Sequence, residues 1–201
     1  PEEHFNLGGK TKWYGAALLR FAPEEFEVDV PHQCRGWPIG YGDLELFYEE
    51  AENLLGVHRF PVEADMRRVA EGLQRLDPHW HMQLLPLGLS TDILNHPHEA
   101  AHFDAYASVR GLKADAENRF LDRVRDRSNL QILTGRKVTG LIPSADDATR
   151  IIGVACDDGS RFEGSAILLA AGALHSPRLL QIYMESTGLS NSLPAYRQVG
   201  R

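Results

Sequence analysis

The stretch FEGSAILLAAGALHSPRLLQI, residues 162–182, decides the expected fold of this chain. Residues 166–171 form a short apolar run, which is typical of a strand buried on both faces of a parallel sheet. Gly172 permits a tight turn that a ligand can approach closely. Ser176 and Pro177 have the pattern of an N-cap followed by proline at the first helical position. The stretch therefore predicts a strand, a small-residue turn and a helix.

A strand followed by a turn and a helix places the N-terminus of the helix at the carboxyl edge of a sheet, where cofactors and anions commonly bind. An ordinary strand–helix unit without a ligand has the same pattern, because such units are common scaffold parts. The stretch alone leaves both interpretations open.

Composition and charge exclude several classes of protein. The 201 residues can bury a core as one domain or two small ones. The net charge is −7 and no basic stripe with interleaved aromatics occurs, so we expect no nucleic-acid partner. No apolar run approaches the roughly 18 residues of a transmembrane helix, and no signal-peptide pattern is present. We expect a soluble protein of the cytoplasm or periplasm. Cys34 and Cys156 are interpreted as separate thiols.

A glycine-rich loop stands near the start of the chain, with Gly8, Gly9, Thr11, Trp13 and Gly15. Paired glycines adopt backbone conformations that other residues avoid, and they expose N–H groups to a ligand. From these residues alone, a plain glycine-rich turn before a short helix is the other interpretation.

Helical spacing of apolar residues predicts helices over residues 43–55, 65–76 and 115–127. Asp43 is the expected N-cap of the first helix, and Gly56 stands where a C-cap glycine belongs. Pro86-Leu87-Gly88 is expected in a loop. Strands are expected at residues 130–134, 137–142, 151–157 and 161–164, with a hairpin at Asp158-Gly159.

A histidine-rich region includes His98-Glu99-Ala100-Ala101-His102, a match to the H-E-x-x-H motif of zinc proteases. Histidines four residues apart can share a helix face and bind zinc. That motif requires a helix and a third ligand downstream, whereas this match opens in a stretch that contains Pro97. We therefore expect no metal site, and we keep a metal-dependent hydrolase built on His98 and His102 as an alternative.

Three regions together resemble the signature regions of the glucose–methanol–choline (GMC) oxidoreductases, which are FAD-dependent. They agree with that family in order and spacing, and they lie within residues 6–57 and 115–201. They are NLGGKTKWYGAALLRF with GWPIGYGDLELFYEEAENLLGV behind it, NLQILTGRKVTGL with IIGVACDDGSRFEGSAILLAAGA behind it, and LLAAGALHSPRLLQ.

The resemblance implies FAD as the cofactor. In the family, the glycine-rich loop packs on the flavin, and the backbone of the valine that matches Val138 contacts the adenine end. The cofactor-binding residues implied for this sequence are Gly8, Gly9, Thr11, Trp13, Gly15, Val138, Ala171, Gly172 and Ala173. Some members bind FAD covalently through a histidine just before the tryptophan. Lys12 stands at that position here, so we expect non-covalent FAD.

The resemblance also implies an α/β fold: a partial FAD-binding Rossmann-like domain with a small antiparallel β-meander, plus part of an α+β substrate domain. We expect the FAD-domain loop and helix at 1–57 and a substrate-domain segment at 58–114. The FAD-domain helix, meander and strand–turn–helix are expected at 115–186, and a linker toward a missing C-terminal part at 187–201. No G-x-G-x-x-G motif occurs, and the catalytic base is expected beyond Arg201.

The expected function is that of a fragment of an oxidoreductase that acts on the CH–OH group of a sugar, polyol or other alcohol, with hydride transfer to flavin N5. Its expected partners are a small-molecule alcohol and an electron acceptor. The isolated fragment is expected to be inactive, to bind FAD weakly and to self-associate. A non-catalytic α/β binding module that kept the fold without a flavin is the second alternative.

Overall fold

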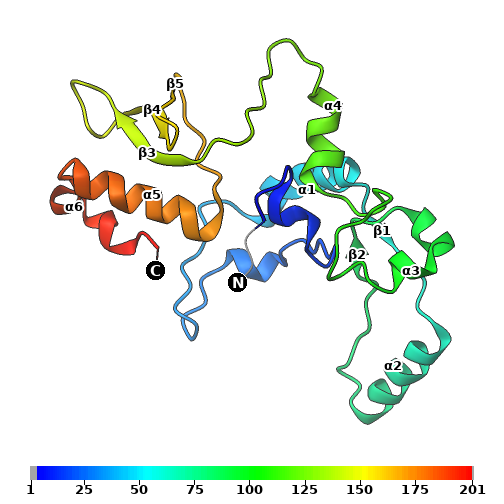
Figure 1. Cartoon of the computed structure of the whole chain (residues 1–201). Coiled ribbons are helices and arrows are strands. Elements are labelled where there is room, and N and C mark those ends of the chain that lie inside the picture. Colours follow the sequence, from blue (N-terminus) through cyan, green and yellow to red (C-terminus); the bar gives the residue numbers. More distant parts are fainter. Residues whose placement is uncertain (1–3, 201) are drawn as a thin grey trace. The chain divides into compact units, whose positions relative to one another are not determined.

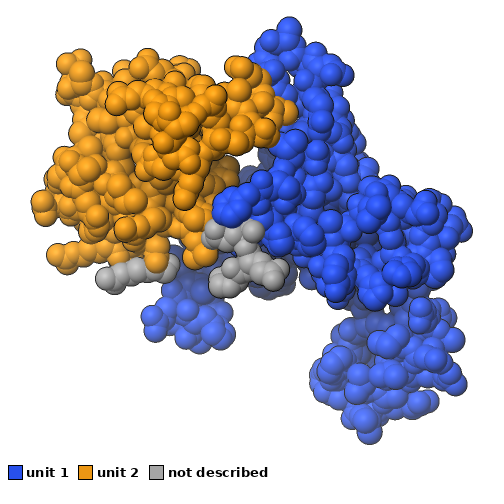
Figure 2. All heavy atoms as spheres, viewed as in Figure 1, with its two compact units in different colours: residues 1–130 blue, residues 131–201 orange. Residues whose placement is uncertain are grey.

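The computed structural model describes residues 4–200 of the chain. The chain divides into two compact units, residues 1–130 and residues 131–201 (Figure 2). The predicted segments that begin at residue 1 and end at Arg201 extend past the described residues, and the position expected for the base lies outside them. In residues 4–200, no helix combines the length and apolar character needed to cross a bilayer.

Unit 1 consists of short helices joined by long loops, as the ribbon shows (Figure 1). Its two longest helices, α1 (Tyr41–Leu55) and α2 (Ala64–Leu76), lie where helical spacing predicts them. The other elements are η1 (Gly9–Lys12), η2 (Pro23–Phe26), β1 (His58–Arg59), β2 (Pro86–Leu87), η3 (Thr91–Asn95), α3 (Pro97–Ala100), the π-helical turn η4 (Glu117–Leu121) and α4 (Asp122–Val124). The predicted helix over 115–127 is thus a π turn followed by a short α-helix.

The ends of α1 follow from two local interactions. Gly40, not Asp43, is the N-cap, so this prediction was wrong by three residues. Asp43 lies in the first turn, where its carboxylate accepts a 2.8 Å hydrogen bond from the N–H of Gly40 and balances the positive end of the helix dipole. At the other end, Gly56 has a φ of 63°, the left-handed conformation expected of a C-cap glycine.

The core of unit 1 forms around residues 86–90, which pair with two distant segments. The N–H of Gly88 donates to the carbonyl of Ala16 at 2.8 Å, and the N–H of Ala114 donates to the carbonyl of Gly88 at 2.7 Å. A side chain at position 88 would lie 2.9 Å from Tyr14 Oη, so glycine permits the close approach. Pro86-Leu87 is therefore a strand, β2, paired with β1, and the expected loop was wrong. Ala16, Leu89 and Ala114 are buried here.

Unit 2 is the predicted antiparallel meander with a helical hairpin packed on it (Figure 1). Strands β3 (Val138–Pro143), β4 (Ile151–Cys156) and β5 (Arg161–Glu163) form one sheet in the order β3-β4-β5. Helix α5 (Gly172–Ser186) packs against β3, and α6 (Leu189–Ser192) and η5 (Pro194–Gln198) follow it. The turn between β4 and β5 has Gly159 at a φ of 84°, which confirms the hairpin predicted there.

Two predicted strands are absent from the described residues. Residues 130–134 are irregular, and so are residues 166–171, where the side chain of Leu168 is 93% exposed. An apolar run becomes a strand only when neighbouring strands satisfy its backbone groups, and residues 4–200 contain no strand paired with this one. The described sheets are both antiparallel, so the parallel arrangement is not observed.

Helix α5 also begins earlier than predicted. Its first residue is Gly172, at a φ of 80°, and Pro177 lies inside the helix rather than at its first position. The hydroxyl of Ser176 accepts a 2.9 Å hydrogen bond from the N–H of Ala171, which satisfies one donor at the start of the helix. Ser176 therefore supports the helix start from within the first turns, not as the N-cap.

Candidate functional site

The glycine-rich loop has the backbone that its glycines predict. Gly8 and Gly9 both lie in the left-handed region, at φ values of 80° and 51°. Nothing lies within 4 Å of the position that a side chain on Gly9 would take, so this backbone is open to a ligand. The hydroxyl of Thr11 donates to the carbonyl of Gly8 at 2.5 Å and accepts from the N–H of Ala116 at 3.0 Å. Thr11 therefore holds the loop together.

Lys12 joins the same loop to residues 115–117. Its ammonium lies 2.6 Å from a carboxylate oxygen of Glu117 and 3.7 Å from one of Asp115. The hydrogen bond that Lys12 donates to Glu117 raises the pKa of Lys12 above its usual range, and the same contact lowers the pKa of Glu117. A lysine held in its charged form is a poor nucleophile. The pairing occupies the Lys12 ammonium, and non-covalent binding of FAD stays a prediction.

Trp13 and Tyr14 complete the loop. The indole of Trp13 stacks on the ring of His4, with 4.3 Å between centroids, while its Nε1 is buried without a hydrogen-bond partner among residues 4–200. Tyr14 donates from its hydroxyl to the carbonyl of Ala114 at 2.8 Å, and burial raises its pKa. A buried donor without a partner is uncommon in folded proteins, so Trp13 Nε1 is a candidate contact for a bound group.

Lys113 is the most deeply buried charged side chain in the described chain, 1% exposed. Its ammonium donates to three backbone carbonyls: Tyr14 at 2.8 Å, Phe103 at 2.5 Å and Tyr106 at 2.7 Å. All three N–H bonds of the ammonium therefore have acceptors. One side chain thus connects the glycine-rich loop to the loop formed by residues 101–113, which we call the pocket loop.

In unit 2, the small-residue turn leaves its backbone accessible. Ala171, Gly172 and Ala173 are exposed, and nothing lies within 4 Å of the position that a side chain on Gly172 would take. Val138 opens β3, is half-buried and pairs with Cys156 of β4. Of the nine residues implied as cofactor ligands, the five from Gly8 to Gly15 belong to unit 1 and the other four to unit 2.

The residues present fit a dinucleotide cofactor at some of these positions and not at others. Gly9 and Gly172 present open backbone in conformations that favour glycine, and Trp13 has an unpaired buried donor. The polar groups of Thr11 and Lys12 already have partners within the protein. Thr11 therefore supports the loop, and its hydroxyl is not available as a direct ligand in this conformation.

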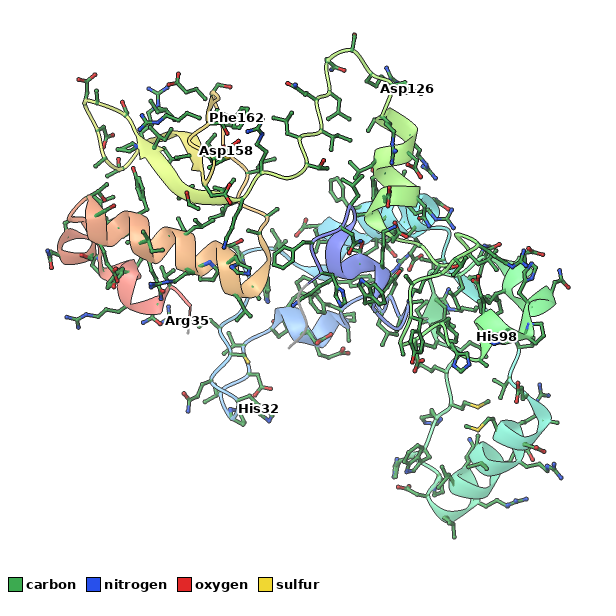
Figure 3. The ribbon with its side chains drawn as sticks, in the orientation of Figure 1. His32, Arg35, His98, Asp126, Asp158 and Phe162 are labelled. Carbon is green, nitrogen blue, oxygen red and sulfur yellow. The ribbon has the colours of Figure 1, made fainter. Side chains whose placement is uncertain are left out.

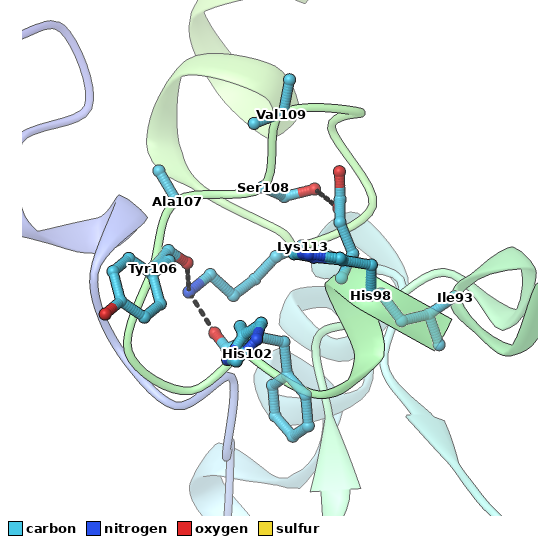
Figure 4. A pocket seen from close by; sticks show the side chains of 10 residues that line it. Ile93, His98, His102, Tyr106, Ala107, Ser108, Val109 and Lys113 are labelled. Carbon is cyan, nitrogen blue, oxygen red and sulfur yellow. Dashed lines mark hydrogen bonds between the residues drawn. The ribbon is translucent and has the colours of Figure 1, made fainter. Parts of the chain in front are cut away.

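A pocket of about 370 Å³ lies between η3, α3 and the pocket loop (Figure 4). Its apolar wall comes from the buried Ile93 and the half-buried Phe103 and Ala107, with Val109, which is 94% exposed, at its edge. The rings of His98, His102 and Tyr106 stand along its rim: the centroids of His98 and His102 are 5.4 Å apart, and those of His102 and Tyr106 are 5.9 Å apart. A concave, mostly apolar site of this volume is typical of small-molecule pockets.

The H-E-x-x-H match lies at this rim, and its geometry does not favour a metal centre. Helix α3, which carries His98 (Figure 3), is only four residues long and ends before His102. Glu99 is engaged elsewhere, since its carboxylate accepts from the hydroxyl of Ser108 at 2.6 Å and from the N–H of Arg110 at 3.0 Å. No cluster of three or more metal-ligating side chains occurs among residues 4–200. The metal-dependent hydrolase is therefore not favoured.

Lys113 and the pocket were missed by the sequence analysis. A weak signal for Lys113 was present, because this lysine stands between the apolar residues Leu112 and Ala114. A charged residue flanked in this way is buried only if its ammonium finds acceptors, and those acceptors come from positions seven to 99 residues away. No local pattern reveals such partners.

Comparison with known proteins adds one match. Residues 86–192 match the family model of GMC oxidoreductases, which describes an FAD-binding domain family. This match covers more than half of the chain and includes the pocket loop, the meander and the turn at Gly172. No curated protein matches the chain.

Proposed function

This chain belongs to the GMC family of oxidoreductases, and on that premise we propose that it helps to bind FAD in an enzyme that oxidises the CH–OH group of an alcohol. The observation that supports the proposal most is the open, left-handed backbone of Gly172 between an apolar segment and a helix N-terminus. Close approach of a cofactor requires backbone of this kind. The match to the family model includes this turn.

The residues proposed to hold FAD are those implied by the resemblance, with roles adjusted to the geometry. Gly8 and Gly9 would present backbone N–H groups, Trp13 would offer its buried indole donor, and Gly172 with its two alanine neighbours would lie against the cofactor. Gly15 would permit the backbone turn at the end of the glycine-rich loop. Val138 would contact the adenine end of FAD through its backbone. Thr11 would act by fixing the loop.

We also propose that residues 166–171 form a strand of a parallel, Rossmann-like sheet in the full-length protein. Their composition fits a strand buried on both faces, and they pair with no strand within residues 4–200. Such a strand would place the turn at Gly172 at the carboxyl edge of the sheet. In this proposal, residues 1–57 and 115–186 belong to the FAD domain, and residues 58–114 to the substrate domain.

When bound, FAD would accept a hydride at N5 from the carbon that bears the hydroxyl group, while a base takes the hydroxyl proton. The residues of this chain would supply position and electrostatics. Lys113 and the Lys12–Glu117 pair hold the glycine-rich loop against residues 113–117, so the loop is preorganised before the cofactor arrives. The exposed turn at Gly172 offers the positive end of α5 to an anionic group.

The test uses the full-length protein after incubation with FAD and removal of the unbound cofactor. We expect flavin absorption bands near roughly 380 and 450 nm, because the cofactor carries its own chromophore. Anaerobic addition of an alcohol substrate should bleach the 450 nm band as the flavin is reduced. A protein that retains no flavin would overturn the proposal, and flavin that no alcohol reduces would favour a binding role without catalysis.

A further inference from the structure

Three polar side chains in the lining of the pocket beside the glycine-rich loop, those of Glu99, Ser108 and Lys113, make hydrogen bonds within the protein. The Glu99 carboxylate accepts from Ser108 and from the N–H of Arg110. The Ser108 hydroxyl, in addition, accepts a 2.8 Å hydrogen bond from the N–H of Leu112. The Lys113 ammonium has its three carbonyl acceptors. None of these three side chains has a donor left for a ligand.

Because Glu99, Ser108 and Lys113 have no donor left, this part of the pocket offers a ligand hydroxyl only the remaining acceptor sites of the Glu99 carboxylate and of the Ser108 oxygen. A sugar or polyol carries a hydroxyl on nearly every carbon, and each hydroxyl that leaves water without a partner costs free energy. The apolar wall of Ile93, Phe103, Ala107 and Val109 offers no such partners. It does remove apolar surface of a ligand from water, which is favourable.

The rim adds a preference for aromatic rings. Ring contacts join His98 to His102 and His102 to Tyr106, and all three residues line the pocket (Figure 4). Within residues 4–200, the side chains of these three residues make no hydrogen bonds. Aromatic pairs prefer offset-stacked or edge-to-face arrangements, and these rings offer both to an aromatic ligand. The polar atoms of these three rings can hydrogen-bond the hydroxyl group of an alcohol at the mouth of the pocket.

The pocket also has a fixed relation to the loop that is proposed to face the cofactor. Lys113, which lines the pocket, hydrogen-bonds the carbonyls of Phe103 and Tyr106 in the pocket loop and the carbonyl of Tyr14 in the glycine-rich loop. Because one buried ammonium holds both loops, a ligand in the pocket and a group on the glycine-rich loop would keep a constant separation. Catalysis by positioning needs such an arrangement.

We propose that this pocket binds the ring of an aromatic alcohol, which is the substrate class of the enzyme, in preference to a sugar or polyol. The inference rests on the proposed function, because it takes the pocket as the substrate's site. Ile93, Phe103, Ala107 and Val109 cover the ring of the alcohol, and His98, His102 and Tyr106 contact it at the rim. Lys113 is a positioning residue that holds the pocket to the glycine-rich loop.

The test measures binding of benzyl alcohol and of glucose to the flavin-loaded full-length protein by ligand-observed NMR, which needs no turnover. Benzyl alcohol should bind about tenfold more tightly than glucose, since only its surface matches the apolar wall. Ala107→Phe, which fills the pocket, should weaken benzyl alcohol binding about tenfold. Ala105→Phe, at an exposed neighbouring position outside the pocket, is the matched control and should leave binding unchanged.

A second pocket variant keeps the inference testable if Ala107→Phe fails to fold. Tyr106→Ala removes an exposed ring but keeps the carbonyl that Lys113 binds, so it should fold and still weaken benzyl alcohol binding. Equal binding of glucose and benzyl alcohol, or no effect of both pocket variants, would overturn this inference and leave the proposed function intact. Bound benzyl alcohol that does not reduce the flavin would overturn the substrate assignment. If the full-length wild-type protein retains no flavin, the proposed function is wrong instead.

Discussion

The ammonium nitrogen of Lys113 lies 2.8 Å from the carbonyl oxygen of Tyr14, although the two residues are 99 positions apart in the sequence. Three further contacts join the same two segments: Thr11 with Ala116, Lys12 with Glu117, and the Tyr14 hydroxyl with the carbonyl of Ala114. The glycine-rich loop therefore depends on residues 113–117 for its conformation. Two of the following predictions test that dependence.

Lys113→Met should destabilise the protein by about 2–4 kcal/mol, because it removes a buried ammonium that hydrogen-bonds three carbonyls in two loops. Urea unfolding measures the change. Lys10→Met is the control, since Lys10 is exposed and its replacement should change the free energy of unfolding by less than about 0.5 kcal/mol. Equal stabilities of the two variants would show that the three hydrogen bonds contribute nothing.

Glu117→Gln should destabilise unit 1 at neutral pH but have little effect in acid. Lys12 holds the pKa of Glu117 below its ordinary value of 4.5, so the folded state binds the proton less readily than the unfolded state. The stabilisation is fully present above pH 4.5 and is lost as the pH falls through the lower, folded pKa. The difference in melting temperature between wild type and variant should therefore shrink below pH 4.5.

Glu71→Gln is the control for this pH series. Glu71 is exposed on α2 and makes no ion pair among residues 4–200, so the same chemical change there should give a small difference at every pH. A difference for Glu117→Gln that persists unchanged in acid would mean that the Lys12–Glu117 pair does not stabilise the fold.

The elements that could be predicted from the sequence are those with local causes. Helix α1 ends at Gly56 because a left-handed residue stops the helix, and the meander turns at Gly159 because that position needs a positive φ. Helix α2 follows from the spacing of its own apolar residues. In each case the pattern and its physical reason lie within one segment.

The rest could not be predicted because its causes lie elsewhere in the chain. Residues 166–171 have the composition of a buried strand, but a strand also requires partners that its own sequence does not contain. Gly88 forms part of a ladder only because Ala16 and Ala114 come beside it. The pocket likewise depends on contacts of Lys113 with residues that are distant in the sequence. The loops proposed to face the cofactor, in contrast, were predicted from their resemblance to the family, which requires no knowledge of contacts.

Gly172→Val in the full-length protein should lose flavin while it keeps most of its secondary structure. The added side chain meets no protein atom within 4 Å at its Cβ, so it would enter the space proposed for the cofactor. The cost of a positive φ, on the order of 1–2 kcal/mol, acts on the protein in addition. Bound flavin is measured by absorbance after desalting, and secondary structure by circular dichroism.

Gly188→Val separates these two effects. Gly188 has a φ of 76° and equally open surroundings, so its replacement imposes the same backbone cost at the N-cap of α6, a position with no proposed cofactor contact. This variant should keep its flavin. If both variants lose flavin to the same extent, or if Gly172→Val retains it fully, the assignment of the turn at Gly172 to the cofactor is wrong.

The last prediction concerns the unpaired segment at residues 166–171. An extended apolar segment with free backbone groups is a template for pairing with another chain. The isolated 201-residue chain should therefore self-associate as its concentration rises, which light scattering would detect. Leu168 is 93% exposed in this segment, and Leu168→Asp should reduce association because a charge opposes burial of the strand.

Leu76→Asp provides the comparison, since Leu76 is 85% exposed but belongs to helix α2 and not to a segment with the composition of a strand. If exposed apolar surface alone drives association, both substitutions should reduce it equally. If unpaired backbone in residues 166–171 is required, only Leu168→Asp should do so, and the full-length protein, in which this segment is proposed to have partner strands, should stay dispersed. Association that neither substitution changes would mean that another surface is responsible and that residues 166–171 do not act as an exposed strand.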